Sequence, residues 1–390
     1  MRNIFGPATK LSNASIGYAL GAAAALTLLA ACSGGSATPP VARSASQSAD
    51  GFTHALTHSF SRSFPGDGRH PEIAALPGAW EKAMQAKSQS SRVEPSRVKP
   101  NIASWKKGTV WVTDAGNNSV YRCTDVTNGC VAQQTVPFGS PSPLPWSEPQ
   151  GIAAGAHDNV YIADTSNSRI VKLSRSGVLM HIYPDLGYYP VGVAVATNGT
   201  ICVTNIISTS GGPGNVTCFS QTGTSIHVAS GGLYNYYFCG FDSAGNLYVD
   251  GFDSNSNVVV EEIAGAAGVG TTEVASSISN VQFPGGIQVD RSNGVLDVED
   301  QIGLVVDQYL LPGYGPATPA SIPLSGSSDP VSFGFAAGDH SLWTADAGLS
   351  QANAYADPTG LSGPSLPSAT SQTGLFSMPI GAVYTSYGQY

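Results

Sequence analysis

Acidic side chains end several short apolar runs of this 390-residue chain, and each run has the form Val-Tyr-Ile-Ala-Asp at 160–164. The residues that end the runs are Asp114, Asp164, Asn205, Glu299 and Asp346. Hard cations bind where several oxygen ligands converge, so a ring of these side chains would hold a divalent cation. We favour a structural interpretation, because a residue repeated in every unit usually serves that unit. Asn167 also follows Asp164 at the spacing of a turn cap.

The other residue types that perform chemistry show no catalytic arrangement in the sequence. Three of the seven histidines precede the repeated region, and His157 and His340 fall in predicted hairpins away from the acids. General acid-base catalysis needs partners within hydrogen-bond reach. The sequence also lacks a serine hydrolase elbow, a phosphate-binding loop and an HExxH motif. We therefore predict no catalytic residue, no metal and no cofactor, with a divalent cation among the repeated acids as the alternative.

Six cysteines suit an exported chain that keeps disulfides. Cys123 and Cys130 flank a turn-rich segment, and Cys202 and Cys218 lie in consecutive predicted strands. We predict these two pairs as disulfides, which leaves Cys239 with its state open. The spacing of the cysteines does not match a zinc site.

The elements that must position these residues are indicated by a repeat that begins near residue 100. A Pro or aromatic residue followed by Gly and apolar residues recurs, with starts at 149, 190, 236, 284, 330 and 379. The apolar runs described above follow most of these starts. Nearly continuous apolar strands are typical of sheets covered on both faces. The sequence therefore predicts an all-β fold over 100–390, a six-bladed β-propeller of four-stranded antiparallel blades.

The second unit, Pro149 to Leu173, closely resembles an NHL repeat, and the run from Val110 to Tyr121 resembles its latter part. In that family the repeats form six-bladed propellers, so the resemblance implies the same fold. Later units depart from the pattern, since Gly251 replaces the acid in the fourth.

A seventh first-strand signal at 379–384 needs a place in a six-bladed ring. We expect this C-terminal strand to pair with Gly108 to Asp114 as the innermost strand of blade one, which removes exposed sheet edges. The alternative inner strand is Pro100 to Trp105.

The N-terminus resembles that of a bacterial lipoprotein precursor. An uncharged segment extends from Ile16 to Ala31 and is followed by Cys32, so that the chain there reads Leu29-Ala30-Ala31-Cys32. The resemblance implies a signal peptide at 1–31, lipidation of Cys32, and an extracytoplasmic protein of the cell envelope held on the membrane by that lipid. A Ser- and Pro-rich tether and weakly ordered lead-in would cover 32–99. The alternative is an ordinary secreted protein that is cleaved elsewhere.

Partners follow from charge and from aromatic residues near the predicted mouth of the propeller. The formal net charge of −9 argues against nucleic acid, whose phosphates need a basic surface. Aromatic side chains are favoured where partners bind, and the candidate residues are Trp146, Tyr188, Tyr234 and Tyr236. We predict a module that binds an envelope protein or glycan. The alternative is a metal-dependent enzyme of the sugar-lactonase or streptogramin-lyase class, whose propellers this architecture resembles.

Overall fold

The computed structural model describes residues 108–123, 145–268, 272–277, 280–290, 294–311, 320–335, 342–355, 369–371 and 376–386. These residues form β-strands and two single-turn 3₁₀ helices, η1 (Ala156–Asp158) and η2 (Thr165–Asn167). In this part of the chain, no helix is long and apolar enough to cross a membrane. The predicted signal peptide, Cys32 and the lead-in to residue 99 lie outside the described residues and stay predictions.

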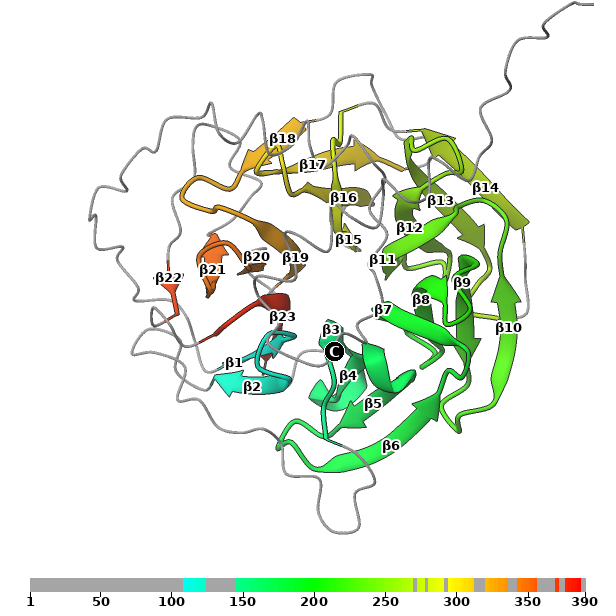
Figure 1. Ribbon diagram of the computed structural model, residues 1–390, viewed down its shortest axis with the longest axis horizontal. Coiled ribbons are helices and arrows are strands. Elements are labelled where there is room, and N and C mark those ends of the chain that lie inside the picture. The colour runs from blue at the N-terminus through cyan, green and yellow to red at the C-terminus, as the bar shows by residue number, and fades with distance from the viewer. Residues whose placement is uncertain are drawn as a thin grey trace, which may run out of the picture. The chain divides into compact units, whose positions relative to one another are not determined.

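The strands form six antiparallel sheets around one axis, which are the blades of a β-propeller (Figure 1). Named from the inside outward, blade one contains β23 (Pro379–Ser386), β1 (Gly108–Asp114) and β2 (Ser119–Cys123). Blade two contains β3 (Pro149–Ala154), β4 (Val160–Asp164), β5 (Arg169–Leu173) and β6 (Leu179–Pro184), and blade three contains β7 (Tyr188–Val195), β8 (Ile201–Ser208), β9 (Pro213–Phe219) and β10 (Ser225–Ala229).

The remaining three sheets follow the same order from the axis to the rim. Blade four contains β11 (Asn235–Phe241), β12 (Leu247–Phe252), β13 (Val258–Ala264) and β14 (Thr272–Ser277). Blade five contains β15 (Pro284–Asp290), β16 (Val295–Asp300), β17 (Val305–Leu310) and β18 (Ala320–Pro323). Blade six contains β19 (Pro330–Phe335), β20 (Leu342–Asp346), β21 (Gln351–Tyr355) and β22 (Ala369–Thr370).

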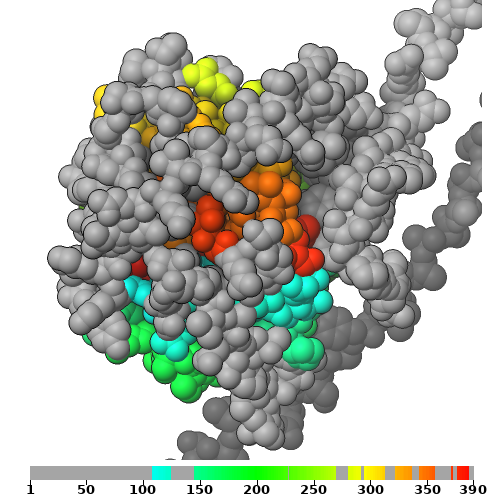
Figure 2. All heavy atoms as spheres, turned by 90° about the vertical axis from the view of Figure 1, so that its left-hand side faces the viewer, coloured from blue at the N-terminus to red at the C-terminus, as the bar shows by residue number. Residues whose placement is uncertain are grey.

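The C-terminal strand completes the first blade. β23 pairs antiparallel with β1, with Gly108 opposite Ser386 and Asp114 opposite Pro379. Figure 2 shows residues from the two ends of the described chain side by side, cyan beside red. The pairing expected from the sequence is therefore found, and β23 takes the inner position for which Pro100 to Trp105 was the alternative.

The hydrophobic core lies between adjacent blades. One cluster joins Trp111 of blade one to Ile162 of blade two, and another joins Tyr161 of blade two to Ile201 of blade three. Inner strands approach very closely, because a Cβ atom added at Gly192 would lie 2.7 Å from the carbonyl oxygen of Tyr237. This close approach explains why glycine recurs just after the Pro or aromatic residue that begins each repeat.

Each propeller of this kind has two ends, which differ in the connections they carry. We call the entry end the one where the inner strands begin, and the opposite end the one where they finish. In the antiparallel blades two to six, the entry end carries the connections from second to third strand and from outer strand to the next inner strand. The repeated acids end the second strands, so they also lie at the entry end.

Candidate functional site

The repeated acids fix the connections that lead into the inner strands. Asp114 accepts hydrogen bonds from the backbone N–H groups of Ser377, at 2.8 Å, and Met378, at 2.9 Å. Asp346 accepts two equivalent bonds, at 2.8 and 3.0 Å, from the connection before β19. These carboxylates therefore support the loops of the entry end, as the structural interpretation of the sequence predicts.

Blade two shows the fullest form of this arrangement. Asp164 accepts hydrogen bonds from the backbone of Ser147 at 2.8 Å, from Asn167 at 2.9 Å and from Arg169 at 2.6 Å. Burial raises the pKa of Asp164, and these bonds oppose the rise. The predicted turn-capping pair of Asp164 and Asn167 is confirmed.

The prediction was wrong for Glu299 in blade five. Asp300 lies opposite Pro284 in the register, and its side chain accepts backbone hydrogen bonds from Gln282 at 3.0 Å and Phe283 at 3.2 Å. Asp300 is therefore the equivalent of the other repeated acids. Two consecutive acids end this strand, and the sequence alone offers no way to choose the second over the first.

These hydrogen bonds also bear on the metal alternative. Each of Asp114, Asp164, Asp300 and Asp346 accepts backbone N–H groups next to its own blade. Within the described ranges, no group of three His, Cys, Asp or Glu side chains is arranged to hold a metal ion. The hydrogen bonds account for the repeated acid without a cation.

The residue before the acid links neighbouring blades. Thr204 accepts a hydrogen bond from the N–H of Gly192 in its own inner strand, at 2.9 Å, and donates to the carbonyl of Tyr237 in blade four, at 2.5 Å. Thr113 likewise accepts an N–H from β23 at 2.9 Å and donates to the carbonyl of Gln150 in blade two. We call this the bridging position, because the threonine hydroxyl there both accepts and donates; alanine occupies it in blades two and six.

Blades four and five place buried carboxyl groups at the bridging position. Asp250 accepts the N–H of Phe238 at 2.8 Å, and Glu299 accepts the N–H of Gly286 at 3.3 Å. Both side chains are fully buried, and the second oxygen of each, Oδ2 or Oε1, has no hydrogen-bond partner among the described residues. Burial raises the pKa of both carboxyls well above their ordinary values.

The charged neighbours of Glu299 favour the same protonation state as burial does. The groups that act electrostatically on Glu299 are all acidic: Asp346, Asp250 and Asp329. Burial and these acids therefore favour the neutral form of Glu299, and burial favours the neutral form of Asp250.

The four predicted mouth residues fall into two groups. Trp146 is 4% exposed and packs in the cluster of Trp111, and Tyr236 is fully buried with its hydroxyl accepting the N–H of Leu233 at 3.2 Å. These two aromatic side chains serve the core and offer no open surface. Tyr188 is half-buried and Tyr234 is exposed, so these two remain available to a partner.

A hairpin in blade three brings the available residues together. Thr209, in the β8–β9 hairpin, donates to the carbonyl of Gly187 at 2.8 Å, and Gly214 donates to the carbonyl of Tyr234 at 2.9 Å. The hairpin therefore lies between the loop that contains Leu186 and the loop that contains Tyr234. We call this region the blade-three surface and define it as Leu186, Tyr188, residues 208–213 and Tyr234.

The sequence analysis missed Leu186, which is the most exposed large apolar side chain described, at 81%. It occupies the connection from β6 to β7, within Pro184-Asp185-Leu186-Gly187. A single leucine in a turn carries no periodic signal, because periodicity indicates faces of strands and helices only. Leu186 could have been found only by asking which connections lead to the entry end.

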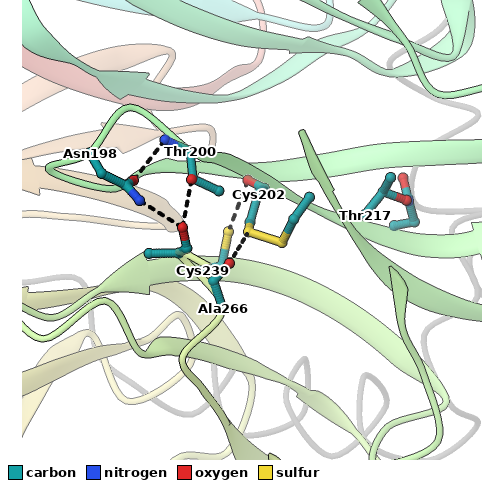
Figure 3. Close-up of a disulfide and its surroundings, with 9 residues drawn as sticks. Asn198, Thr200, Cys202, Thr217, Cys239 and Ala266 are labelled. Carbon is teal, nitrogen blue, oxygen red and sulfur yellow. Dashed lines mark hydrogen bonds between the residues drawn. A yellow bond between two sulfur atoms is a disulfide. The ribbon is translucent and has the colours of Figure 1, made fainter. Parts of the chain in front are cut away.

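Three cysteines, Cys202, Cys218 and Cys239, lie within the core between blades three and four (Figure 3). Cys202 and Cys218 face each other on β8 and β9 and form a disulfide, as predicted. Cys239 of β11 is a buried free thiol whose pKa is raised by burial. Cys123 is disulfide-bonded, but Cys130 lies outside the described residues, so their pairing stays a prediction.

One blade of the propeller matches a known protein family model. A family model described as NHL repeat matches residues 147–173, which extend from the connection before β3 to the end of β5. The chain contains an NHL repeat. The match covers the blade in which Asp164, Asn167 and Arg169 form the full hydrogen-bonded cap. No curated protein sequence matches the chain.

Solved structures share the propeller fold at low sequence identity. A chain of the nidogen/laminin complex has a TM-score of 0.54 and 17% identity, and the match covers 71% of this chain and 98% of that one. A protein of unknown function from Bacteroides caccae has a TM-score of 0.51 and 14% identity, over 72% of this chain and 99% of that one. A streptogramin B lyase has a TM-score of 0.49 and 16% identity, over 71% of this chain and 83% of that one. The similarities to the nidogen/laminin chain and to the Bacteroides caccae protein show the fold alone.

Proposed function

We propose that this propeller is a binding module of the cell envelope, held to the membrane by lipid on Cys32, which captures an envelope protein or glycan on its blade-three surface. The observation that carries the proposal is the grouping of Leu186, Tyr188 and Tyr234 around one hairpin at the entry end. Apolar and aromatic side chains exposed together mark sites where partners bind.

The backbone of this surface supports binding because its loops are tied to regular strands. Tyr234 donates its N–H to the carbonyl of Phe252 at 2.8 Å and accepts from Gly214. Tyr188 is the first residue of β7 and pairs with Ser208 of β8. A surface that is already ordered loses little conformational entropy when a partner binds.

The chemistry of the entry end favours binding over catalysis. The acids that repeat there accept hydrogen bonds from the loops, and those of blades one, two and six are fully buried at Asp114, Asp164 and Asp346. A general acid or base must reach its substrate, which these side chains do not. The exposed groups on the blade-three surface are apolar, aromatic and hydroxyl groups, which suit a protein or glycan partner.

Affinity measurements with matched variants test the proposal. The mature chain is screened against soluble glycans and purified envelope proteins, and the ligand found is titrated against Tyr234→Ala and Leu186→Ser. We expect Tyr234→Ala to weaken binding by about 1 to 3 kcal/mol. Val228→Ser is the control, because Val228 is 53% exposed on the outer strand of the same blade. Binding that is lost in the control and kept in both entry-end variants would place the site on the rim.

Metal analysis of the same preparation tests the enzyme alternative. A stoichiometric, tightly held divalent ion that is lost from Asp164→Ala or Asp346→Ala would favour a metal-dependent enzyme. Mapping the mature N-terminus tests the anchor, since processing at a residue other than Cys32 would contradict it.

A further inference from the structure

The few basic residues of the propeller gather at the opposite end of blades one and two. Residues 108–390 contain five Lys and Arg and 21 Asp and Glu. Arg291 lies outside the described residues, and Arg169 forms the buried ion pair with Asp164. The other three are Arg122, Lys172 and Arg175. A basic cluster in so acidic a domain marks a surface with its own electrostatic preference.

Contacts between the two blades bring the side chain of Arg122 and the turn that contains Arg175 to one aromatic ring. The turn after β5, which contains Arg175, lies against blade one, because a Cβ atom added at Gly177 would be 3.7 Å from the Trp111 ring. Arg122 lies over the same ring, 5.9 Å from its centroid. Lys172, near the end of β5, lies 5.2 Å from the ring centroid of Tyr161.

Two exposed apolar side chains adjoin the cations. Val178 is 60% exposed at the start of the outer-strand connection, and Met180 is 50% exposed on β6. His157 is exposed in η1 at the same end. An acid also lies beside them, Asp158, which is 5% exposed and interacts with Arg175 and His157. We define the membrane-facing surface as Arg122, His157, Lys172, Arg175, Val178 and Met180.

The chain enters the propeller at this same end. β1 is a second strand that begins at Gly108 opposite Ser386, where the inner strand β23 finishes. Gly108, which follows residues 1–107, therefore lies at the opposite end of blade one. The last 26 of them, 82–107, contain seven Lys and Arg residues and one Glu. Anionic lipid attracts basic segments next to a membrane anchor.

We propose that the membrane-facing surface lies on an anionic lipid bilayer, with its cations at the lipid phosphates and Val178 and Met180 in the interfacial layer. This goes beyond the proposed function, because it fixes the orientation of the propeller. The entry end, with the blade-three surface, then points away from the membrane. Apolar side chains that enter the interface and cations that meet headgroups are the two components of peripheral membrane binding.

The test measures the environment of a label at the surface. The purified mature chain carries Met180→Cys with an environment-sensitive fluorophore, and it is mixed with vesicles of phosphatidylcholine with or without phosphatidylglycerol. We expect a blue shift and quenching by nitroxide lipids only with phosphatidylglycerol. Adding Arg175→Gln should lower the fraction in the membrane by about fivefold, the effect of one basic residue at an anionic surface.

Matched labels and variants make each outcome decisive. Leu310→Cys is the first control, because Leu310 is 57% exposed in blade five, far along the ring from the cations. Tyr234→Cys at the entry end is the second. The proposal fails if label 180 stays in water, if it responds equally to phosphatidylcholine alone, or if the controls respond as strongly. It also fails if Arg175→Gln has no effect while a Lys99→Gln, Lys106→Gln and Lys107→Gln variant abolishes the response.

The readout separates this proposal from the proposed function. The label reports its own surroundings whether or not Cys32 carries acyl chains, and ligand binding at Tyr234 is measured in solution. A spectral change with inorganic phosphate in the absence of vesicles would indicate a phosphate site and would overturn the lipid assignment.

Discussion

Blade two and blade five solve the same structural problem with different side chains. In blade two, Asp164 is paired with Arg169 and accepts hydrogen bonds from three residues, and the bridging position holds a small alanine. In blade five, Asp300 forms the cap without an ion pair in the described residues, and Glu299 is buried at the bridging position. The comparison teaches that these two blades keep the aspartate cap, whereas the residue at the bridging position varies from an alanine to a buried carboxyl.

Removing residues 379–390 should have the largest effect on this comparison, because it removes the inner strand of blade one. β1 would lose its inner partner, β23, and would keep only β2. The Asp114 side chain would also lose its hydrogen bond from the N–H of Met378 if the connection rearranged. We expect loss of the cooperative folding of the whole ring, measured by thermal unfolding. A truncated chain that melts like the wild type would show that β23 is not needed for the ring.

Asp164→Ala should cost about 3 to 5 kcal/mol of unfolding free energy, because it leaves the Arg169 cation buried beside an N–H without its acceptor. Denaturant unfolding measures the loss. The double variant with Arg169→Met is the control and should recover part of it. An Asp164→Ala variant as stable as the wild type would contradict the role of the cap in stabilising blade two.

Replacing both Cys202 and Cys218 by Ala should cost about 2 to 3 kcal/mol, since the loop that the disulfide closes is short. Blade three lacks the aspartate cap, because Asn205 stands in place of the acid. The experiment measures how much the disulfide contributes to the stability of a blade without that cap. Peptide mapping without reduction checks the pairing, and a bond from Cys239 to Cys202 or Cys218 would refute it.

Glu299→Gln should have the smallest effect at pH 4, and the effect should grow with pH. The folded pKa is raised, so the contribution of Glu299 is fully present below its unfolded pKa of about 4 and is lost as pH rises through the folded value. The variant should therefore gain on the wild type as pH increases, by at most about 1.4 kcal/mol for each pH unit between the two pKa values.

Asp250→Asn should behave in the same way, and Thr204→Val provides the contrast. Thr204 does not titrate, so loss of its hydroxyl should cost the same at every pH. The free energies of unfolding of the wild type and of Glu299→Gln are compared between pH 4 and pH 8. A constant difference between them would show that Glu299 is ionised in the folded protein.

The repeat allowed the strands to be predicted from the sequence, because each unit carries two separate patterns, one for the inner strand and one for the second strand. The pattern around Val160 to Asp164 gave the second strands, and the Pro-Gly mark gave the inner strands. The partner of Asp164 was also predictable, since Asn167 lies within the same turn. Local hydrogen bonds of this kind are visible as fixed spacings.

The properties that depend on contacts between blades could not be predicted. Trp146 is buried because it packs in the same cluster as Trp111, and Leu186 is exposed in a connection that contacts the β8–β9 hairpin. The role of Glu299 follows from a one-residue register difference. None of these relations has a constant separation along the chain, so no spacing reveals them.

The pairing of β1 with β23 also has a consequence for the timing of folding. The first described strand meets the last one, and residues 108 and 386 become partners only after all the residues between them have been made. Contacts this distant in sequence form slowly, because a long loop must close before they are gained. Until then the inner edge of β1 is open and able to pair with another chain. We expect β1 to be prone to aggregation until β23 pairs with it. Correct folding of the ring therefore depends on β23.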